Sequence, residues 1–183
     1  MKIPYVDSHA HLDGFAAQGM ADAVIERAAA AGVRRIVAMG GNVEADRINV
    51  ELCARHPERL VCSVGYDRSE VFKPHDFSRF DDLLARREVV AVGETGLDYH
   101  YDRESAEEQK LLFGEMLRLS AGAGKPVIIH SREADEDTLA MLREHVAAWR
   151  GDAPPGVLHC FTGTRDFARA VLDLGYMVGF SGI

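Results

Sequence analysis

The chain has 183 residues, of which 47% are hydrophobic and 27% charged, so it can bury a sizeable core and is not disordered, collagenous or coiled-coil in composition. Its 21 basic and 29 acidic residues give a net charge of −8, which excludes a broad basic surface for duplex DNA. Contact with nucleic acid must then be local or carried by metal ions. Three cysteines without CxxC spacing favour free thiols in a reducing compartment. We find no signal peptide or membrane span and expect a soluble cytoplasmic chain.

Short β-branched runs alternate along the chain with longer segments of helical period. Strands are predicted, in chain order, at residues 3–6, 35–39, 60–64, 89–92, 127–129, 157–158 and 176–180. Most of them are apolar throughout, which is typical of parallel strands covered on both faces. Apolar residues at helical spacing predict six connecting helices, and Gly32, Gly124 and Gly175 stand where helices are expected to end.

This alternation is compatible with an open doubly wound sheet or with a closed (β/α)8 barrel of the TIM type. The doubly wound sheet would have a glycine-rich phosphate-binding turn after its first strand, but residues 7–13 read DSHAHLD instead. A barrel needs eight strands and typically ~250 residues, roughly 70 more than are present here. We therefore predict an α/β fold of the TIM-barrel type with about seven strands, an incomplete barrel.

Residue types that bind metals gather at the carboxyl ends of four predicted strands. His9 and His11 follow the first strand, and Glu94 follows the fourth between two glycines. His130 ends the fifth strand and His159 the sixth. Residues i and i+2 of a strand point the same way, so His9 and His11 present two imidazoles side by side. A barrel brings these four ends together at its active-site face, whereas an open sheet does not, and the pattern predicts a metal site.

Four segments combine these residues with their neighbours: VDSHAHLD at 6–13, GETGLDYH at 93–100, PVIIHSR at 126–132 and LHCFTG at 158–163. In order and approximate spacing they resemble signature blocks of the TatD family of metal-dependent deoxyribonucleases. The resemblance implies a (β/α) barrel, a divalent metal centre and hydrolysis of DNA phosphodiester bonds, often as a 3′–5′ exonuclease. It implies a DNA substrate, which we expect to be single-stranded, with no membrane and no obligate protein partner.

Carried over residue by residue, the resemblance makes five residues metal ligands: His9, His11, Glu94, His130 and His159. Glu94 is then the catalytic carboxylate that bridges two divalent ions, which the residues allow to be Mg, Mn or Zn. His9, His11, Glu94 and an aspartate after an eighth strand would hold one ion. Glu94, His130 and His159 would hold the other. Arg132 and Arg165 are candidate substrate-binding residues, because a guanidinium pairs with phosphate and the segment 162–165 opens a helix.

The sequence departs from the family pattern at two places. Residues 64–68 read VGYDR where the family has Gly-x-His-Pro, and no aspartate block of an eighth strand occurs before Ile183. We expect residues 1–183 to be one metal-dependent hydrolase domain that lacks the eighth strand and its helix, with low stability and weak activity. Two alternatives stay open. One is an amidohydrolase-type C–N or ester hydrolase. Such enzymes often carry a modified lysine at this strand end, and the presence of Glu94 there argues against this alternative. The other is a catalytically silent truncated fragment.

Overall fold

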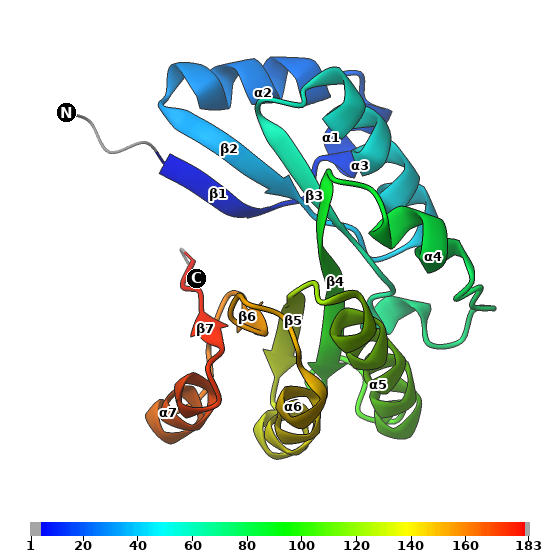
Figure 1. Ribbon diagram of the computed structural model, residues 1–183, viewed down its shortest axis with the longest axis vertical. Helices are drawn as coiled ribbons and strands as arrows, with labels where there is room; N and C mark the ends of the chain where they lie inside the picture. Colours follow the sequence, from blue (N-terminus) through cyan, green and yellow to red (C-terminus); the bar gives the residue numbers. More distant parts are fainter. Residues whose placement is uncertain (1–4, 182–183) are drawn as a thin grey trace.

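The computed structural model describes residues 5–181, in which seven parallel strands form one curved sheet in the order β1-β2-β3-β4-β5-β6-β7 (Figure 1). The strands are β1 Tyr5–Ala10, β2 Val33–Ala38, β3 Leu60–Val64, β4 Val89–Asp98, β5 Val127–Arg132, β6 Gly156–Leu158 and β7 Met177–Val178. Each strand pairs in parallel with the next along the chain. The predicted barrel-type α/β fold is confirmed as an open seven-stranded barrel wall, in which β1 and β7 do not pair within the described residues.

Helices cover the outer side of this curved sheet (Figure 1). They are α1 Asp13–Ala17, α2 Ala21–Ala30, α3 Val43–Arg55, α4 Arg79–Leu84, α5 Ala106–Ala123, α6 Asp135–Ala148 and α7 Arg165–Asp173, with a 3₁₀ turn η1 at Arg68–Glu70. Two helices connect β1 to β2, so residues 5–181 hold seven α-helices where six were predicted. Gly124 ends α5 in the left-handed conformation, at φ 63°, as its position predicted.

The strands that carry the candidate site are longer than their apolar runs predicted. β3 spans the predicted residues 60–64, but β1 extends to Ala10, β4 to Asp98 and β5 to Arg132. Their polar ends remain in the hydrogen-bonded ladder, where residues 95–98 of β4 pair with residues 129–132 of β5. The candidate residues expected just after β1 and β4 therefore lie within them, except His11. Residues 3–4 of the first predicted strand lie outside the described residues.

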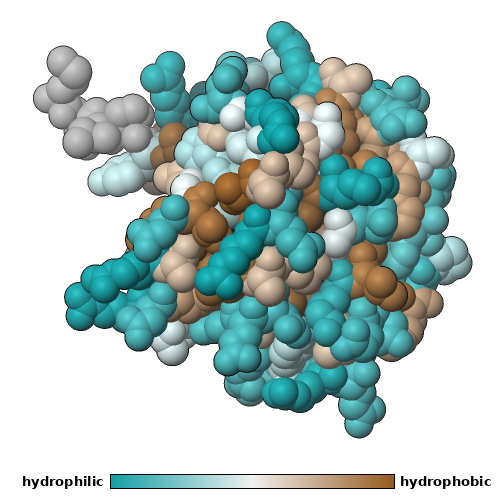
Figure 2. All heavy atoms as spheres, turned by 60° about the horizontal axis from the view of Figure 1, so that its bottom comes forward, coloured by the Kyte–Doolittle hydropathy of each residue, from teal (hydrophilic) through white to brown (hydrophobic). Residues whose placement is uncertain are grey.

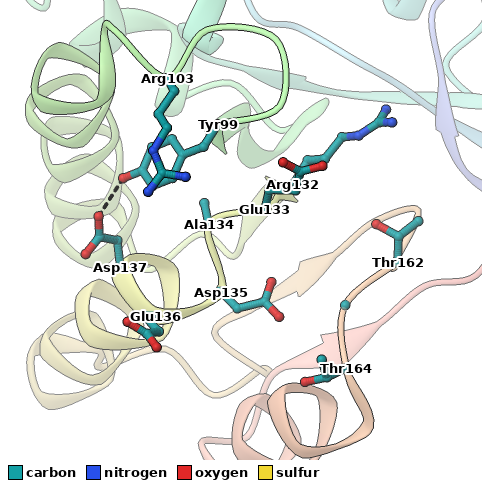
Figure 3. Close-up of a pocket in the computed structure, with 11 residues that line it drawn as sticks. Tyr99, Arg103, Arg132, Glu133, Ala134, Asp135, Glu136, Asp137, Thr162 and Thr164 are labelled. Carbon is teal, nitrogen blue, oxygen red and sulfur yellow. Dashed lines mark hydrogen bonds between the residues drawn. The ribbon is translucent and has the colours of Figure 1, made fainter.

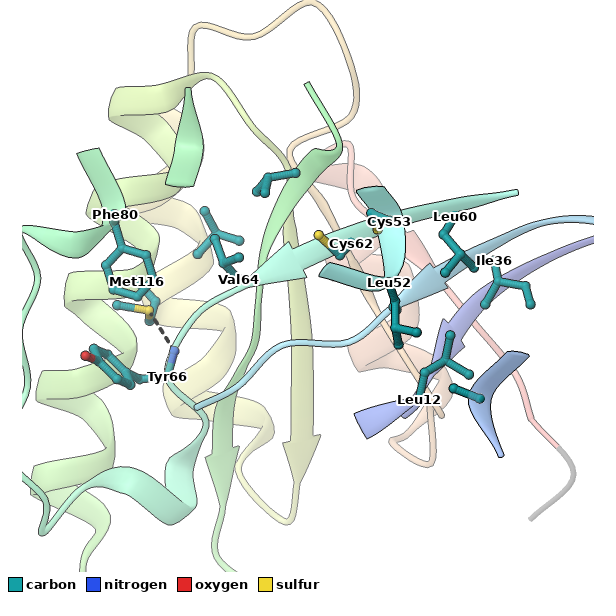
Figure 4. Packing of buried hydrophobic residues seen from close by; sticks show 14 of the residues in the cluster. Leu12, Ile36, Leu52, Cys53, Leu60, Cys62, Val64, Tyr66, Phe80 and Met116 are labelled. Atoms are coloured by element: carbon teal, nitrogen blue, oxygen red, sulfur yellow. Dashed lines mark hydrogen bonds between the residues drawn. The ribbon is translucent and has the colours of Figure 1, made fainter. Parts of the chain in front are cut away.

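Two apolar clusters pack the helices against the sheet. The first lies between β1–β4 and helices α2, α3, α4 and α5, and Figure 4 shows part of it around Phe80 and Met116. The second lies between β5–β7 and helices α5, α6 and α7, around Phe113 and Leu142. Helix α5 joins both clusters, with Met116 facing one and Phe113 the other, so it fastens the two halves of the sheet beside β4.

The surface is mostly hydrophilic on the face that Figure 2 shows, with hydrophobic residues recessed between charged ones. Four large apolar side chains are exposed along the two outermost strands or just beyond β7: Tyr5, Val6, Met177 and Phe180. Among the described helices, none combines the length and apolar character needed to cross a membrane.

Gly96 is required by the close approach of β4 and β5. Its φ is +139°, and a Cβ there would meet the backbone carbonyl of His130. We predict that Gly96→Ala destabilises the chain by about 2–4 kcal/mol, because the side chain adds a backbone clash to a disfavoured φ. Gly122 in α5 has open space around it and is the control, for which Gly122→Ala should stabilise by about 0.5–1 kcal/mol. Urea unfolding of both variants tests this, and equal effects would contradict it.

His145 makes stability depend on pH. It is 4% exposed, its Nδ1 faces the Tyr176 hydroxyl and its Nε2 lies 3.2 Å from the Ser120 hydroxyl oxygen. Burial lowers the pKa of His145 to about 4, so the unfolded chain binds a proton between pH 6.5 and 4 that the folded chain does not. We predict a loss of up to about 3 kcal/mol over that window, which His145→Gln removes. Urea unfolding at pH 7, 5.5 and 4.5 measures it, and identical pH slopes would contradict the assignment.

Candidate metal centre

Four histidines from three strands and their ends surround one carboxylate, Glu94 of β4. Glu94 is 9% exposed, and its backbone N–H donates to the carbonyl of Gly40 beyond β2, which fixes its position at the carboxyl end of the sheet. His9 lies in β1, His11 just beyond it, His130 in β5 and His159 just beyond β6. The structure thus brings the five residues predicted as ligands to one point.

The two oxygens of Glu94 face different histidine pairs. Oε2 lies 3.2 Å from Nε2 of His9 and 3.3 Å from Nε2 of His11. Oε1 lies 2.7 Å from Nε2 of His159 and 3.6 Å from Nδ1 of His130. The cluster therefore has two sides, each with one carboxylate oxygen and two imidazole nitrogens.

The histidine rings are closely packed. His9 stacks on His159 with 3.8 Å between ring centroids, and Nε2 of His9 lies 3.2 Å from Nε2 of His11. Burial lowers the pKa of His9, whereas the hydrogen bond to Glu94 raises the pKa of His11. Burial also raises the pKa of Glu94, but the hydrogen bonds from His11, His159 and His9 outweigh it and hold that pKa below its usual range.

This donor set fits divalent metal ions. Ligand atoms of His9, Glu94 and His159 all lie within 4.8 Å of one another. Imidazole and carboxylate ligands suit Zn, Mn or Mg. Imidazoles this close together would repel one another if they were all protonated, which favours the neutral form that binds metals. The Nδ1 atoms of His9 and His159 are buried without a hydrogen-bond partner among the described residues, so their Nε2 atoms are the nitrogens aimed at Glu94.

A second buried carboxylate, Asp98, contacts the cluster and was not singled out from the sequence. It is fully buried at the end of β4, and its Oδ2 lies 2.9 Å from Nε2 of His130 and 3.3 Å from Nε of Arg68. Burial raises the pKa of Asp98, but the Tyr101 N–H, His130 and Arg68 together lower it below its ordinary value. Positions 94 and 98 share one face of a strand, and this spacing was the available signal.

A groove of about 1170 Å³ lies beyond the ends of β5 and β6 (Figure 3). Arg132 and Arg103 line it together with the residues 162–164, but none of the five clustered residues does. Arg132 lies over the ring of Tyr101 at 5.0 Å from its centroid. It is in the same strand as His130, two residues further along.

The start of α7, the expected anion site, has an acidic residue beside it. Burial raises the pKa of Asp135 and the nearby Thr164 N–H opposes that rise, while the Thr164 hydroxyl accepts a hydrogen bond from Phe167 N. The groove also carries four acidic side chains, at positions 133 and 135–137. Arg165 is exposed and does not line the groove, so its substrate role remains a prediction.

The chain is similar in sequence to a known family and its members. The TatD related DNase family matches residues 6–183. The chain is 38% identical to the uncharacterized metal-dependent hydrolase YcfH of Escherichia coli over 181 residues, which cover 97% of this chain and 66% of YcfH. It is 35% identical to the 3′-5′ ssDNA/RNA exonuclease TatD of Edwardsiella piscicida over 167 residues, covering 87% of this chain and 60% of that protein.

A solved structure of a family member has the same fold. The crystal structure of YjjV, a TatD homologue of Escherichia coli, superposes with a TM-score of 0.82 at 31% identity, covering 96% of this chain and 67% of that one. Fold and cluster together define a barrel-type α/β protein with histidines and a carboxylate, residue types that bind metals, gathered at its strand ends. The chain belongs to the TatD family. It spans about two thirds of the length of the curated relatives it matches.

Proposed function

We propose that the protein hydrolyses phosphodiester bonds of single-stranded DNA with two divalent ions, removing nucleotides from the 3′ end. The observation that carries the proposal is the division of the Glu94 oxygens between two histidine pairs, since a carboxylate placed in this way can bridge two ions. The name of the Edwardsiella relative, a 3′-5′ exonuclease of single-stranded DNA and RNA, supports the substrate class.

Each residue has a role in this proposal. Glu94 would bridge two ions and offset part of their charge, His9 and His11 would hold one ion, and His130 and His159 would hold the other. Ions bound there would supply a water of lowered pKa and positive charge at the attacking and leaving oxygens of the phosphodiester. Mixed imidazole and carboxylate ligands suit Mg, Mn or Zn.

Arg132 is the substrate-binding residue that the geometry favours. Its guanidinium lies over Tyr101, whose ring is exposed. An arginine beside an exposed aromatic ring suits a strand in which phosphates alternate with unstacked bases. This local contact is consistent with a chain whose net charge is −8.

A cleavage assay tests the proposal. Single-stranded DNA labelled at the 5′ end is incubated with the chain and Mg²⁺, Mn²⁺ or Zn²⁺, and parallel reactions contain RNA or duplex DNA of the same sequence. We expect a ladder of shortened labelled products from single strands, and none from Glu94→Gln. Cleavage that survives in Glu94→Gln, or no cleavage with any ion, would overturn the proposal.

The rival amidohydrolase-type function is tested beside it. Glu94 occupies the strand position where such enzymes often carry a modified lysine, which favours phosphodiester chemistry. Hydrolysis of activated amides or esters that is lost in Glu94→Gln, without any DNA cleavage, would establish the rival instead.

A further inference from the structure

The ring of His130 lies between two carboxylates and is turned opposite to the rings of His9 and His159. Its Nε2 is 2.9 Å from Asp98 Oδ2, and its Nδ1 is 3.6 Å from Glu94 Oε1. His9 and His159 present Nε2 to Glu94 instead. Their buried Nδ1 atoms have no partner within the described part of the chain, so His130 differs from both in having a carboxylate on its far nitrogen.

Asp98 is itself held rigidly. Its Oδ1 accepts the backbone N–H groups of His100 and Tyr101, both at 3.0 Å. Gln109 of α5 fastens its backbone, accepting from Asp98 N at 2.7 Å and donating to the Asp98 carbonyl at 3.2 Å. A carboxylate fixed in this way can fix the ring that it contacts.

Arg68 supplies the counter-charge. It belongs to the segment 64–68, whose sequence departs from the family block, and its Nε lies 3.3 Å from Asp98 Oδ2. Tyr101, next to Asp98 in the following turn, has Arg68 5.9 Å from its ring centroid. This positive charge allows Asp98 to remain an acceptor although it is fully buried.

We infer that Asp98, supported by Arg68, is a positioning residue that fixes the tautomer of His130. Asp98 accepts the Nε2–H, which leaves the Nδ1 lone pair directed at the side of the cluster that holds Glu94 Oε1. A ring nitrogen is free to bind a metal when the other nitrogen carries the proton, and the partner of that proton sets both tautomer and ring orientation. The part of this inference that concerns ions rests on the proposed metal centre.

The tautomer can be measured without any ion. Nitrogen-15 NMR of the histidine side chains in the metal-free chain at pH 8 reports which nitrogen of His130 carries the proton. We expect Nε2–H in the wild type, and Nδ1–H or a mixture in Asp98→Ala. Asp98→Asn keeps an acceptor oxygen and should keep the wild-type tautomer. Nδ1–H in the wild type, or an unchanged tautomer in Asp98→Ala, would overturn the inference.

Metal titration extends the test. Asp98→Ala should weaken the binding of one of the two ions by about 10–100-fold and leave the binding of the other nearly unchanged. Asp98→Asn should have a smaller effect. Asp46→Asn is the matched control, because Asp46 is another fully buried carboxylate paired with an arginine but does not contact the clustered histidines. An equal loss in Asp46→Asn would show a general effect of destabilisation and overturn the role of Asp98. If the wild type binds no ion, the proposed function fails, while the NMR result still decides the tautomer.

Discussion

Glu94→Ala is expected to abolish binding of both divalent ions, whereas loss of any single histidine removes or weakens only one. The carboxylate contributes Oε1 to one side of the cluster and Oε2 to the other, so its removal damages both. We expect more than about 100-fold weaker binding at both sites, beyond the 10–100-fold usual for the loss of a supporting group. Calorimetric titration with Zn²⁺ or Mn²⁺ measures both steps.

His11→Ala is the matched comparison for this prediction. Its Nε2 contacts only the Oε2 side of Glu94, at 3.3 Å, and its side chain is more exposed than those of the other clustered histidines. One binding step should therefore persist in His11→Ala. An unchanged stoichiometry in Glu94→Ala would refute the bridging role.

Arg79→Met is expected to cost about 3–5 kcal/mol of folding stability, because it leaves a buried carboxylate without its counter-charge. Arg79 Nη1 lies 2.8 Å from Asp46 Oδ2, and Asp46 is fully buried while it accepts the N–H groups of Gly41 and Gly65. Arg79 also lies over the ring of Phe80 at 5.0 Å from its centroid. The loss therefore includes packing and loosens the loops that follow β2 and β3.

The pH dependence of this loss has a definite sign. Burial raises the pKa of Asp46 to about 7 even with Arg79 opposing it, and removal of Arg79 raises that pKa further. A carboxyl whose folded pKa lies above its unfolded value loses stability as pH rises, so Arg79→Met should be more destabilised at pH 8.5 than at pH 5.5. Arg47→Met is the control, because Arg47 forms only exposed pairs with Glu44 and Glu51 and should change stability little. Equal losses in Arg79→Met and Arg47→Met would contradict the buried-pair account.

Much of the candidate site could be predicted because its chemistry is concentrated in short blocks at strand ends. The spacing of His9 and His11 predicts two imidazoles on one side, and their Nε2 atoms lie 3.2 Å apart. Periodicity could not predict that β4 continues from Glu94 to Asp98, since polar residues and Gly96 interrupt the apolar run there and the ladder is completed by β5. Apolar runs locate the covered part of a strand and miss its polar end.

Other features depend on tertiary contacts that no local pattern reveals. Arg79 meets Asp46 across 33 residues of sequence, and Asp98 meets His130 across 32. Asp98 shares a strand face with Glu94 but was not singled out from the sequence, and its partners Arg68 and Gln109 come from other elements.

A crystal structure of the chain grown with Zn²⁺ tests most directly whether Glu94 bridges two ions. Anomalous difference density at the zinc edge should show two peaks. One should lie about 2.0–2.2 Å from Glu94 Oε2 with His9 and His11, and the other at a similar distance from Oε1 with His130 and His159. A single peak shared by both oxygens, or zinc bound away from Glu94, would contradict the account.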